Sequence, residues 1–457
     1  MSIGSSGRIV VEIDPGQKKR LYSALAHEGL SLKEWFIKNM NTFLDNRNQI
    51  SLDFSKVEES IIINDTSMET ATAPTKELLD RGVSAIKVSK KLNEIDWSFI
   101  KRKIQTPLEK IHPYPAKFIG DIPRELIANI PIPEGTAVLD PFVGSGTSLV
   151  EAQRAGLSSI GIDLNPIACL ISRVKTSQYP EGLQDAIKSV LDISKTKKTH
   201  RKSEIPNINH WFKPEIQIAV DAISSTISQK EYTPWRDHLK LILSSILVRV
   251  SNQDSDTRYA AVEKNIKYDD VFRLFENSSD KLISSLGKRS WNLTESEVLE
   301  ANTLEVSPEQ IKQPIGLVVT SPPYPNAYEY WLYHKYRMWW LGHNPISVKE
   351  KEIGARAHFF KKNGHTPEFF LDQMSSTFSL LDKVLVQDGY ACFVVGRSKI
   401  HGQVIDNGNI IQQAAKNHGL SFVTRIERDI YSQRKSFNLS HANIKTESIL
   451  VFKKVAK

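Results

Sequence analysis

A short strand that runs into a glycine-rich turn constrains the fold of this chain more than any other feature. Ala137–Leu139 is an apolar strand candidate that leads into D-P-F-V-G-S-G-T at 140–147. The spacing of apolar residues then predicts a helix that stops at Gly156, and Ser159–Ile162 gives a second strand that ends at Asp163. A strand, a helix and a strand in this order predict a βαβ unit of a parallel sheet.

The turn inside this unit is suited to holding a ligand. Gly144 and Gly146 let the backbone turn sharply and approach a bound molecule closely. The helix that follows directs its first N–H groups at such a molecule. Asp163 ends the second strand, where a carboxylate accepts hydrogen bonds from two ribose hydroxyls. The spacing G-S-G-T lacks the full dinucleotide-binding fingerprint.

Further strand candidates extend the α/β pattern. Ile315–Val319 precedes the motif T-S-P-P-Y, and Tyr390–Val395 and Ser448–Phe452 follow later in the chain. The stretch from about 170 to 300 reads mainly as helix by the periodicity of its apolar residues. We therefore predict an α/β fold, with one twisted, mostly parallel Rossmann-like sheet and a largely helical insertion.

The motif T-S-P-P-Y at 320–324 directly follows an apolar strand. An exocyclic amino nitrogen is a poor nucleophile, because its lone pair is delocalised into the ring. Two hydrogen-bond acceptors that face its hydrogens would draw that lone pair out, and the candidates are Ser321 and the backbone carbonyl of Pro322. Pro323 brings no competing N–H donor. Tyr324 can stack on a base that is swung out of the double helix, which offsets part of the cost of flipping.

Together, the two motifs resemble those of DNA methyltransferases that act on exocyclic amino groups. D-P-F-V-G-S-G-T is similar to the cofactor loop of that family, and S-P-P-Y fits its catalytic motif, (Asp/Asn/Ser)-Pro-Pro-(Tyr/Phe). The resemblance covers roughly 107–170 and 300–455. It implies an S-adenosylmethionine-dependent enzyme that acts on double-stranded DNA, with Ser321, Pro322, Pro323 and Tyr324 as catalytic residues.

The resemblance also implies a set of cofactor-binding residues. I-H-P-Y-P-A-K-F-I at 111–119 resembles the segment that covers the methionine part of the cofactor. Family members often carry an acidic residue near the adenine, whereas E-A-N-T-L-E places Asn302 there, which departs from the family pattern. The expected contacts are Lys117, Phe118, Asp140, Pro141, Phe142, Gly144, Ser145, Gly146, Thr147, Asp163 and Asn302.

The expected target base depends on Ser321. Serine in the first motif position favours cytosine N4, because the family's adenine N6 enzymes more often carry aspartate, so N6 methylation is the alternative. Methylation at cytosine C5 requires a cysteine nucleophile, and neither Cys169 nor Cys392 lies in a Pro-Cys loop. A glutamine methyltransferase that acts on proteins would favour asparagine at position 321.

Residues 1–50 resemble a ribbon-helix-helix module. Arg8–Ile13 alternates as a strand, and two helical segments follow that are separated at Glu28-Gly29. In that family two chains pair their strands and the ribbon enters the major groove. Arg8 and Val10 are therefore candidate DNA contacts, and a homodimer is expected. Residues 51–95, with few aromatic and many polar side chains, are interpreted as a linker.

The remaining bounds follow from the motifs. Residues 96–170 form the cofactor half, 171–300 the helical insertion with a candidate role in target recognition, and 301–457 the catalytic half. The chain has 60 Lys and Arg against 52 Asp and Glu, which suits a polyanionic partner. Basic loops supply the further candidate DNA contacts Lys197, Lys198, Arg201, Arg434 and Lys435.

Other features exclude whole classes of protein. Two cysteines cannot form a disulfide framework, and no Cys/His cluster predicts a metal site. Neither a signal pattern nor a bilayer-spanning apolar run is found, so we expect a cytoplasmic protein without a membrane partner. The expected function is site-specific methylation of cytosine N4 in DNA, in a restriction-modification context with a cognate endonuclease. A DNA-binding regulator with an inactive methyltransferase core is the non-enzyme alternative.

Overall fold

The computed structural model describes Leu25 and residues 76–455, except 101–104, 116–117, 198–204, 257, 326–327, 360–363 and 431–445. The chain divides into two units, Met1–Ala73 and Pro74–Lys457. The ribbon-helix-helix module predicted for residues 1–50 lies outside the described residues, apart from Leu25. Leu25 belongs to a helix, and its side chain is buried. All elements named below belong to the second unit.

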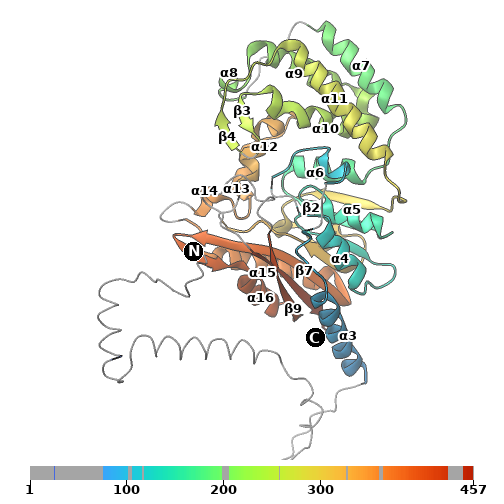
Figure 1. Ribbon diagram of the computed structural model, residues 1–457, viewed down its shortest axis with the longest axis vertical. Coiled ribbons are helices and arrows are strands. Elements are labelled where there is room, and N and C mark those ends of the chain that lie inside the picture. Colours follow the sequence, from blue (N-terminus) through green and yellow to red (C-terminus); the bar gives the residue numbers. More distant parts are fainter. Residues whose placement is uncertain are drawn as a thin grey trace, which may run out of the picture. The chain divides into compact units, whose positions relative to one another are not determined.

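An eight-stranded sheet forms the centre of this unit (Figure 1). Seven strands follow the order β5-β2-β1-β6-β7-β10-β9, and β8 pairs with β7. The first five are parallel neighbours, whereas β10 is antiparallel to both β7 and β9. The strands are β1 (Ala137–Asp140), β2 (Ser159–Asp163), β5 (Ser296–Glu300), β6 (Ile315–Thr320), β7 (Leu385–Ile400), β8 (Gln403–Asp406), β9 (Leu420–Asp429) and β10 (Thr446–Lys454).

Helices cover both faces of the sheet. Ala137 and Leu139 of β1 belong to an apolar cluster with α15 (Pro367–Val384) and α16 (Asn407–Lys416). Val138, between them, belongs to the opposite cluster with α3 (Lys76–Asn93) and α4 (Asp121–Asn129). This alternation is the period of two that a strand imposes on a sheet covered on both faces. The predicted α/β fold with a mostly parallel sheet is confirmed.

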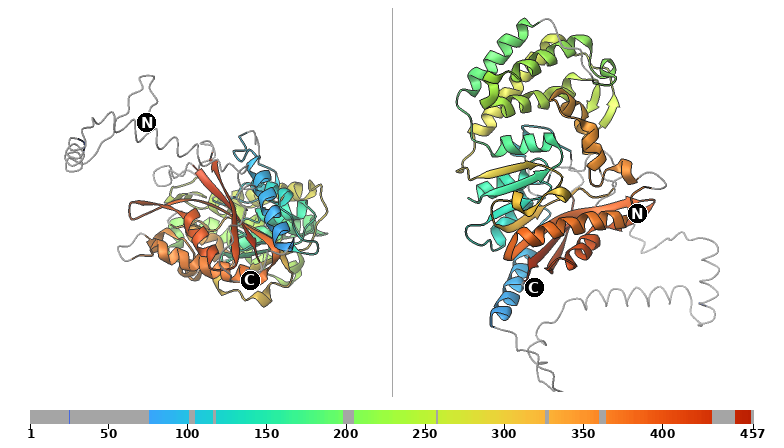
Figure 2. Two further views of the ribbon diagram at one scale, coloured as in Figure 1. Left: turned by 90° about the horizontal axis from the view of Figure 1, so that it is seen from below. Right: turned by 180° about the vertical axis from the view of Figure 1, so that it is seen from behind.

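The helical insertion follows β2, and its helices share an apolar cluster with α12 (Tyr330–Trp340) and α13 (Pro345–Lys351), which lie outside it. Its helices gather above the sheet in Figure 1 and in the right view of Figure 2. The elements are α6 (Pro166–Thr176), α7 (Leu183–Thr196), α8 (Ile208–Trp211), α9 (Pro214–Ile227), η3 (Lys230–Trp235), α10 (Arg236–Val250), the hairpin β3 (Gln253–Ser255) and β4 (Arg258–Ala261), and α11 (Tyr268–Gly287). The others are η2 (Leu108–Lys110), α5 (Thr147–Arg154), η4 (Thr303–Glu305), η5 (Pro308–Gln310) and α14 (Arg356–Phe359).

Two regions differ from the sequence-based interpretation. β5 falls within 171–300, yet it pairs with β2 as an edge strand of the main sheet and is not part of the insertion. Residues 76–93, interpreted as linker, form α3. Val88 and Leu92 of α3 are buried against the sheet, and their spacing of four residues gives the helix one apolar stripe.

The two ends of the helical insertion lie together. The side-chain nitrogen of Gln153 donates to the carbonyl of Thr176 at 3.0 Å and to the carbonyl of Thr294 at 2.8 Å. Arg289 donates to the carbonyl of Ser177 at 2.6 Å, close to the same point. The chain therefore leaves the sheet and returns to it at neighbouring positions. Among the described residues, no helix is long and apolar enough to cross a membrane.

Arg337 of α12 joins that helix to the helical insertion. Its side chain is 1% exposed. The guanidinium donates to the carbonyl of Ser244 in α10 at 2.9 Å and to the carboxylate of Asp256 between β3 and β4. A buried guanidinium requires such partners, because an unpaired charge in the interior costs several kcal/mol.

We expect Arg337→Ala to lower the free energy of unfolding by about 3 kcal/mol, since it leaves the Ser244 carbonyl and Asp256 without their donor. Arg258, 73% exposed on the same hairpin, is the matched control. Arg258→Ala should change the free energy by about 0.5 kcal/mol at most. Urea unfolding followed by circular dichroism measures both, and equal effects would contradict the role given to Arg337.

Candidate functional site

The glycine loop and T-S-P-P-Y meet at one edge of the sheet. β1 and β6 are adjacent, and the strand order runs outward from them in opposite directions. Ligands of open α/β sheets bind beside the carboxyl ends of the strands at such a switch point. The Thr320 hydroxyl donates to the Asp140 carboxylate at 2.6 Å, across 180 residues of sequence. The fold therefore brings the two predicted motifs into contact.

The glycine loop is held from behind by α6. The Ser172 hydroxyl donates to the Gly144 carbonyl at 2.9 Å, and the Lys175 ammonium donates to the Ser145 carbonyl at 2.7 Å. Gly146 has φ +77°, and a Cβ there would lie 2.9 Å from the Cα of Ser172. Only glycine combines this conformation with this closeness. The loop is thus built around Gly146, and Thr147 begins α5 directly after it.

Two carboxylates flank the loop. Asp163 accepts the N–H of Gly144 at 2.9 Å and the N–H of Asn165 at 2.8 Å. Asp140 is buried and accepts the N–H of Phe142 at 3.1 Å. Burial raises the pKa of each carboxyl to about 6, while the hydrogen bonds counter that rise. Since each carboxylate oxygen has two lone pairs, Asp163 keeps acceptor capacity for a ligand.

The remaining loop residues pack close to β1. The Thr303 hydroxyl donates to the carbonyl of Pro141, and Phe142 packs against the apolar cluster of α15 and α16. Asn302 lies just beyond Glu300, the residue that pairs with Asp163 in the sheet. The Asn302 side chain accepts the N–H of Leu304 at 3.2 Å, so it caps η4.

Ser321 has a fixed hydroxyl. It donates to the carbonyl of Val394 in β7 at 3.0 Å. A carbonyl only accepts, so the Ser321 proton is directed at β7 and the oxygen keeps its lone pairs for another donor. Pro322 is buried and Pro323 is half-buried. Burial, with Glu447 nearby, raises the pKa of Tyr324 well above its usual value, so its phenol stays neutral.

Tyr114, which the sequence analysis did not single out, links the segment 111–119 to the glycine loop and to α12. Its ring stacks on Tyr330 at 5.7 Å and on His334 at 5.2 Å. A Cβ on Gly144 would lie 3.5 Å from this ring. Tyr114 of this segment therefore lies against the glycine loop, and the expected cover over the methionine part of the cofactor stays a prediction. Phe118 packs toward the cluster of α3 and α4.

Glu352 and Gly354 were also missed. The Glu352 carboxylate accepts the N–H of Tyr330 at 2.7 Å and the N–H of Trp331 at 3.1 Å, at the start of α12. Burial raises the pKa of Glu352 to about 8, and the two N–H groups counter that rise. Gly354 lies against the backbone of Tyr324. These residues follow T-S-P-P-Y by about thirty positions, and no motif marks them in the sequence.

Of the predicted basic DNA contacts, the structure describes Lys197 alone, and its partners do not lie at this edge. Lys197 donates to the hydroxyls of Ser225 and Thr226, at 3.2 and 2.9 Å, within the helical insertion. The residues Lys117, Arg8, Val10, Lys198, Arg201, Arg434 and Lys435 lie outside the described residues. No group of metal-ligating side chains is found in the described part of the chain.

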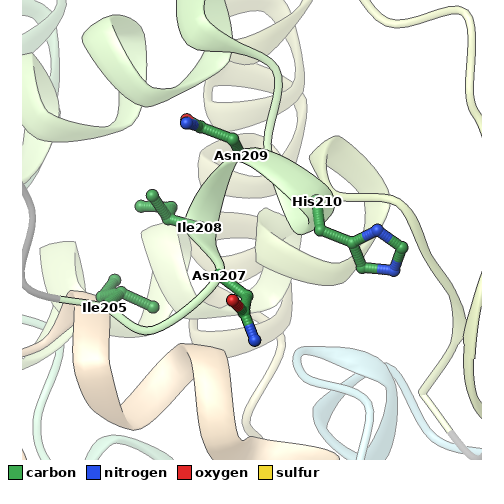
Figure 3. Close-up of a pocket in the computed structure, with 5 residues that line it drawn as sticks. All are labelled: Ile205, Asn207, Ile208, Asn209 and His210. Carbon is green, nitrogen blue, oxygen red and sulfur yellow. The ribbon is translucent and has the colours of Figure 1, made fainter.

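A hollow of about 590 Å³ lies beside α8, away from the strand ends. Ile205, Asn207, Ile208, Asn209 and His210 line it. Figure 3 shows Asn207 and His210 projecting from this turn in different directions. The Asn209 oxygen accepts the side-chain N–H of Gln217 at 2.8 Å. Because these side chains diverge and belong to the insertion, the hollow is not the site that the two motifs form.

Comparisons with known proteins point to one family. Residues 4–175 match the model of the DNA methylase family N6_N4_Mtase. The type II methyltransferase M.MvaI of Kocuria varians is 28% identical over 268 residues, which cover 52% of this chain and 58% of the relative. M.BsoBI of Geobacillus stearothermophilus is 24% identical over 270 residues, or 52% and 53% of the two chains. The chain thus spans a little over half the length of these relatives.

A solved structure and a small protein add to the comparison. The rRNA methyltransferase aviRa of Streptomyces viridochromogenes shows 11% identity over 77% of this chain and 90% of that chain, with a TM-score of 0.29. An uncharacterised 7.3 kDa protein of the Eco57IM 5' region in Escherichia coli is 42% identical over 62 residues, which are 13% of this chain and all of that protein.

Proposed function

We propose that the chain is a member of the DNA methylase family and that it transfers a methyl group from S-adenosylmethionine to an exocyclic amino group of a DNA base. The observation that carries this proposal is the hydrogen bond between Thr320 and Asp140, at the sheet's switch point. This hydrogen bond sets the glycine loop beside Ser321. A cofactor bound at the end of β1 and a base bound at the end of β6 would therefore be neighbours.

The residues at the loop fit this cofactor. Glycine at 146 lets the loop lie close against α6, because a Cβ there would lie 2.8 Å from the Ser172 hydroxyl oxygen, and a Cβ on Gly144 would lie 3.5 Å from the ring of Tyr114. Asp163 keeps lone pairs for ribose hydroxyls. When bound, the cofactor supplies an electrophilic methyl group on a positively charged sulfur, and the nearby carboxylates suit that charge. Pro141, Phe142, Ser145, Thr147 and Asn302 complete the proposed set, with Lys117 and Phe118 in the covering segment.

Ser321 would orient the nucleophile. Because its own proton is donated to the Val394 carbonyl, the Ser321 oxygen can accept one amino hydrogen of the base. The carbonyl of Pro322 can accept the other amino hydrogen. Both bonds strengthen as the nitrogen becomes positive, which is the differential stabilisation that catalysis needs. Tyr324 would stack on the flipped base.

We propose cytosine N4 as the acceptor, with adenine N6 as the alternative, because the first motif position is Ser321. We also propose a restriction-modification context with a cognate endonuclease, which the type II relatives support. A homodimer through residues 1–50 and DNA contacts at the basic loops belong to the same proposal.

Mass analysis of nucleosides from DNA incubated with the protein and labelled cofactor tests this function. N4-methylcytosine formed by the intact protein, and absent with Ser321→Ala and Tyr324→Ala, is the expected result. N6-methyladenine would retain the mechanism and change the base. No methylated base, on DNA that contains most short sequences, would overturn the proposal in favour of the DNA-binding regulator.

Cofactor affinity is expected to fall as the pH drops below about 6. The pKa of Asp163 and that of Asp140 are both raised to about 6 by burial. Above that pH both are ionised and accept hydrogen bonds. Below it they protonate, so the dissociation constant should rise by up to about tenfold per pH unit for each group. Calorimetric titration between about pH 5 and pH 8 measures this, and a flat profile would contradict it. Asp163→Asn should bind more weakly and respond less to pH.

A further inference from the structure

Glu352–Gly354, the support segment, connects α13 to α14 and is buried throughout. Each oxygen of the Glu352 carboxylate accepts a backbone N–H from the first turn of α12, that of Tyr330 or that of Trp331. The first N–H groups of a helix have no partner within the helix, and a carboxylate satisfies them and their partial positive charge. Glu352 thereby fixes where α12 begins.

Gly354 contacts the catalytic motif itself. Its φ is +72°, and a Cβ would lie 2.8 Å from the carbonyl oxygen of Tyr324 and 3.0 Å from its carbonyl carbon. Both are backbone atoms, so a side chain at 354 could fit only if the S-P-P-Y backbone moved. The support segment therefore holds the motif at its far end, while the hydrogen bond from Ser321 to Val394 holds it at the near end.

The support segment also acts toward the cofactor loop through a short series of rings. Tyr330, whose N–H Glu352 accepts, stacks on Tyr114 with an angle of 24° between the rings. Tyr114 in turn lies against Gly144. Moving the start of α12 would therefore disturb the stack that covers the glycine loop.

We propose that Glu352 and Gly354 are positioning residues, which align the base held by S-P-P-Y with the methyl group held at the glycine loop. This inference rests on the proposed function. Glu352 fixes Tyr330, and Gly354 fixes the backbone of Tyr324, so neither needs to touch the substrate. A displacement of about 1 Å between reacting groups can lower the rate by about 10²-fold, so residues that only hold the reacting groups in place can have a large effect on the rate.

Single-turnover methylation, with enzyme in excess over DNA, separates positioning from folding. The rate constant reports alignment, and the amplitude reports the fraction of folded, active protein. Above about pH 8 the Glu352 carboxyl is ionised, so Glu352→Gln there sets an amide N–H against a backbone N–H, and Gly354→Ala drives a Cβ into Tyr324. We expect each to lower the rate constant by about 10²-fold at unchanged amplitude.

Two matched controls exist in the same region. Gly342 has φ +87° with no atom within 4 Å of an added Cβ, so Gly342→Ala carries the backbone strain alone. Glu350 is exposed, so Glu350→Gln changes the charge alone. Both should keep the wild-type rate constant. Wild-type rate constants in Glu352→Gln and Gly354→Ala, or a loss of amplitude alone, would overturn the inference. No product from the wild-type protein would instead overturn the proposed function, and this inference with it.

Discussion

Replacing Ser321 with alanine is expected to lower the single-turnover rate of methyl transfer by about 10²- to 10³-fold, the loss typical when a site gives up one group that stabilises developing charge. In the proposed mechanism the Ser321 oxygen accepts an amino hydrogen of the base, while its own proton is donated to the Val394 carbonyl. Its removal leaves one amino hydrogen without a partner in the transition state. Rapid-quench assays with labelled cofactor measure the rate, and calorimetry should show cofactor affinity within about threefold of the wild type.

Two further variants sharpen that test. Ser321→Asp keeps an acceptor in the place where the family motif also admits aspartate, so it should retain more activity than alanine. Ser376 lies exposed on α15, where its hydroxyl donates to the carbonyl of Asp372, and Ser376→Ala should leave the rate unchanged. If Ser321→Ala kept more than about a third of the wild-type rate, the acceptor role would be wrong.

Gly146→Ala is expected to weaken cofactor binding by more than about 100-fold. The residue sits at φ +77°, which costs an alanine about 1–2 kcal/mol. The new Cβ would also lie 2.8 Å from the Ser172 hydroxyl and 2.9 Å from its Cα. The side chain can rotate, but the backbone of α6 cannot yield without moving the helix. We therefore expect the glycine loop to shift instead, and calorimetric titration measures the loss.

Gly156, at the other end of α5, isolates the contact from the strain. It has φ +78° and nothing within 4 Å of a Cβ, so Gly156→Ala carries the same conformational cost without the collision. Both variants should lose a similar 1–2 kcal/mol of stability from the backbone, about as much as a left-handed alanine costs. Only Gly146→Ala should lose the cofactor. Equal losses of affinity would show that strain alone decides.

The sequence predicted those strands that are buried on both faces. Ala137–Leu139, Ile315–Val319 and Tyr390–Val395 are nearly continuous apolar runs, and each lies in the middle of the sheet. β5 and β9 were missed because they are the edge strands. β5 has the sequence S-E-V-L-E, in which polar residues precede and follow the two apolar ones. An edge strand of this kind shows neither a continuous apolar run nor a clear alternation of apolar and polar residues.

The candidate site also contains residues that the sequence predicted and residues that it did not. Asp140, Gly146 and Ser321 were predicted because the chemistry of the cofactor loop and of the amino group fixes residue types at short spacing. Tyr114 and Glu352 were not, because each acts through a tertiary contact: one on Gly144, the other on the start of α12. Glu352 lies 22 residues from its partner Tyr330, and nothing in the local sequence specifies that pairing.

The bonds of Gln153 bear on how much change the helical insertion can accept. One side chain on α5 grips the chain both where it departs at Thr176 and where it returns at Thr294. The chain between those points is closed into a loop with both ends held at α5, so a change in its length should cost little loop-closure entropy. A change within the helical insertion should therefore preserve both the chain positions that Gln153 holds and the groups of α10 and the hairpin that hold Arg337.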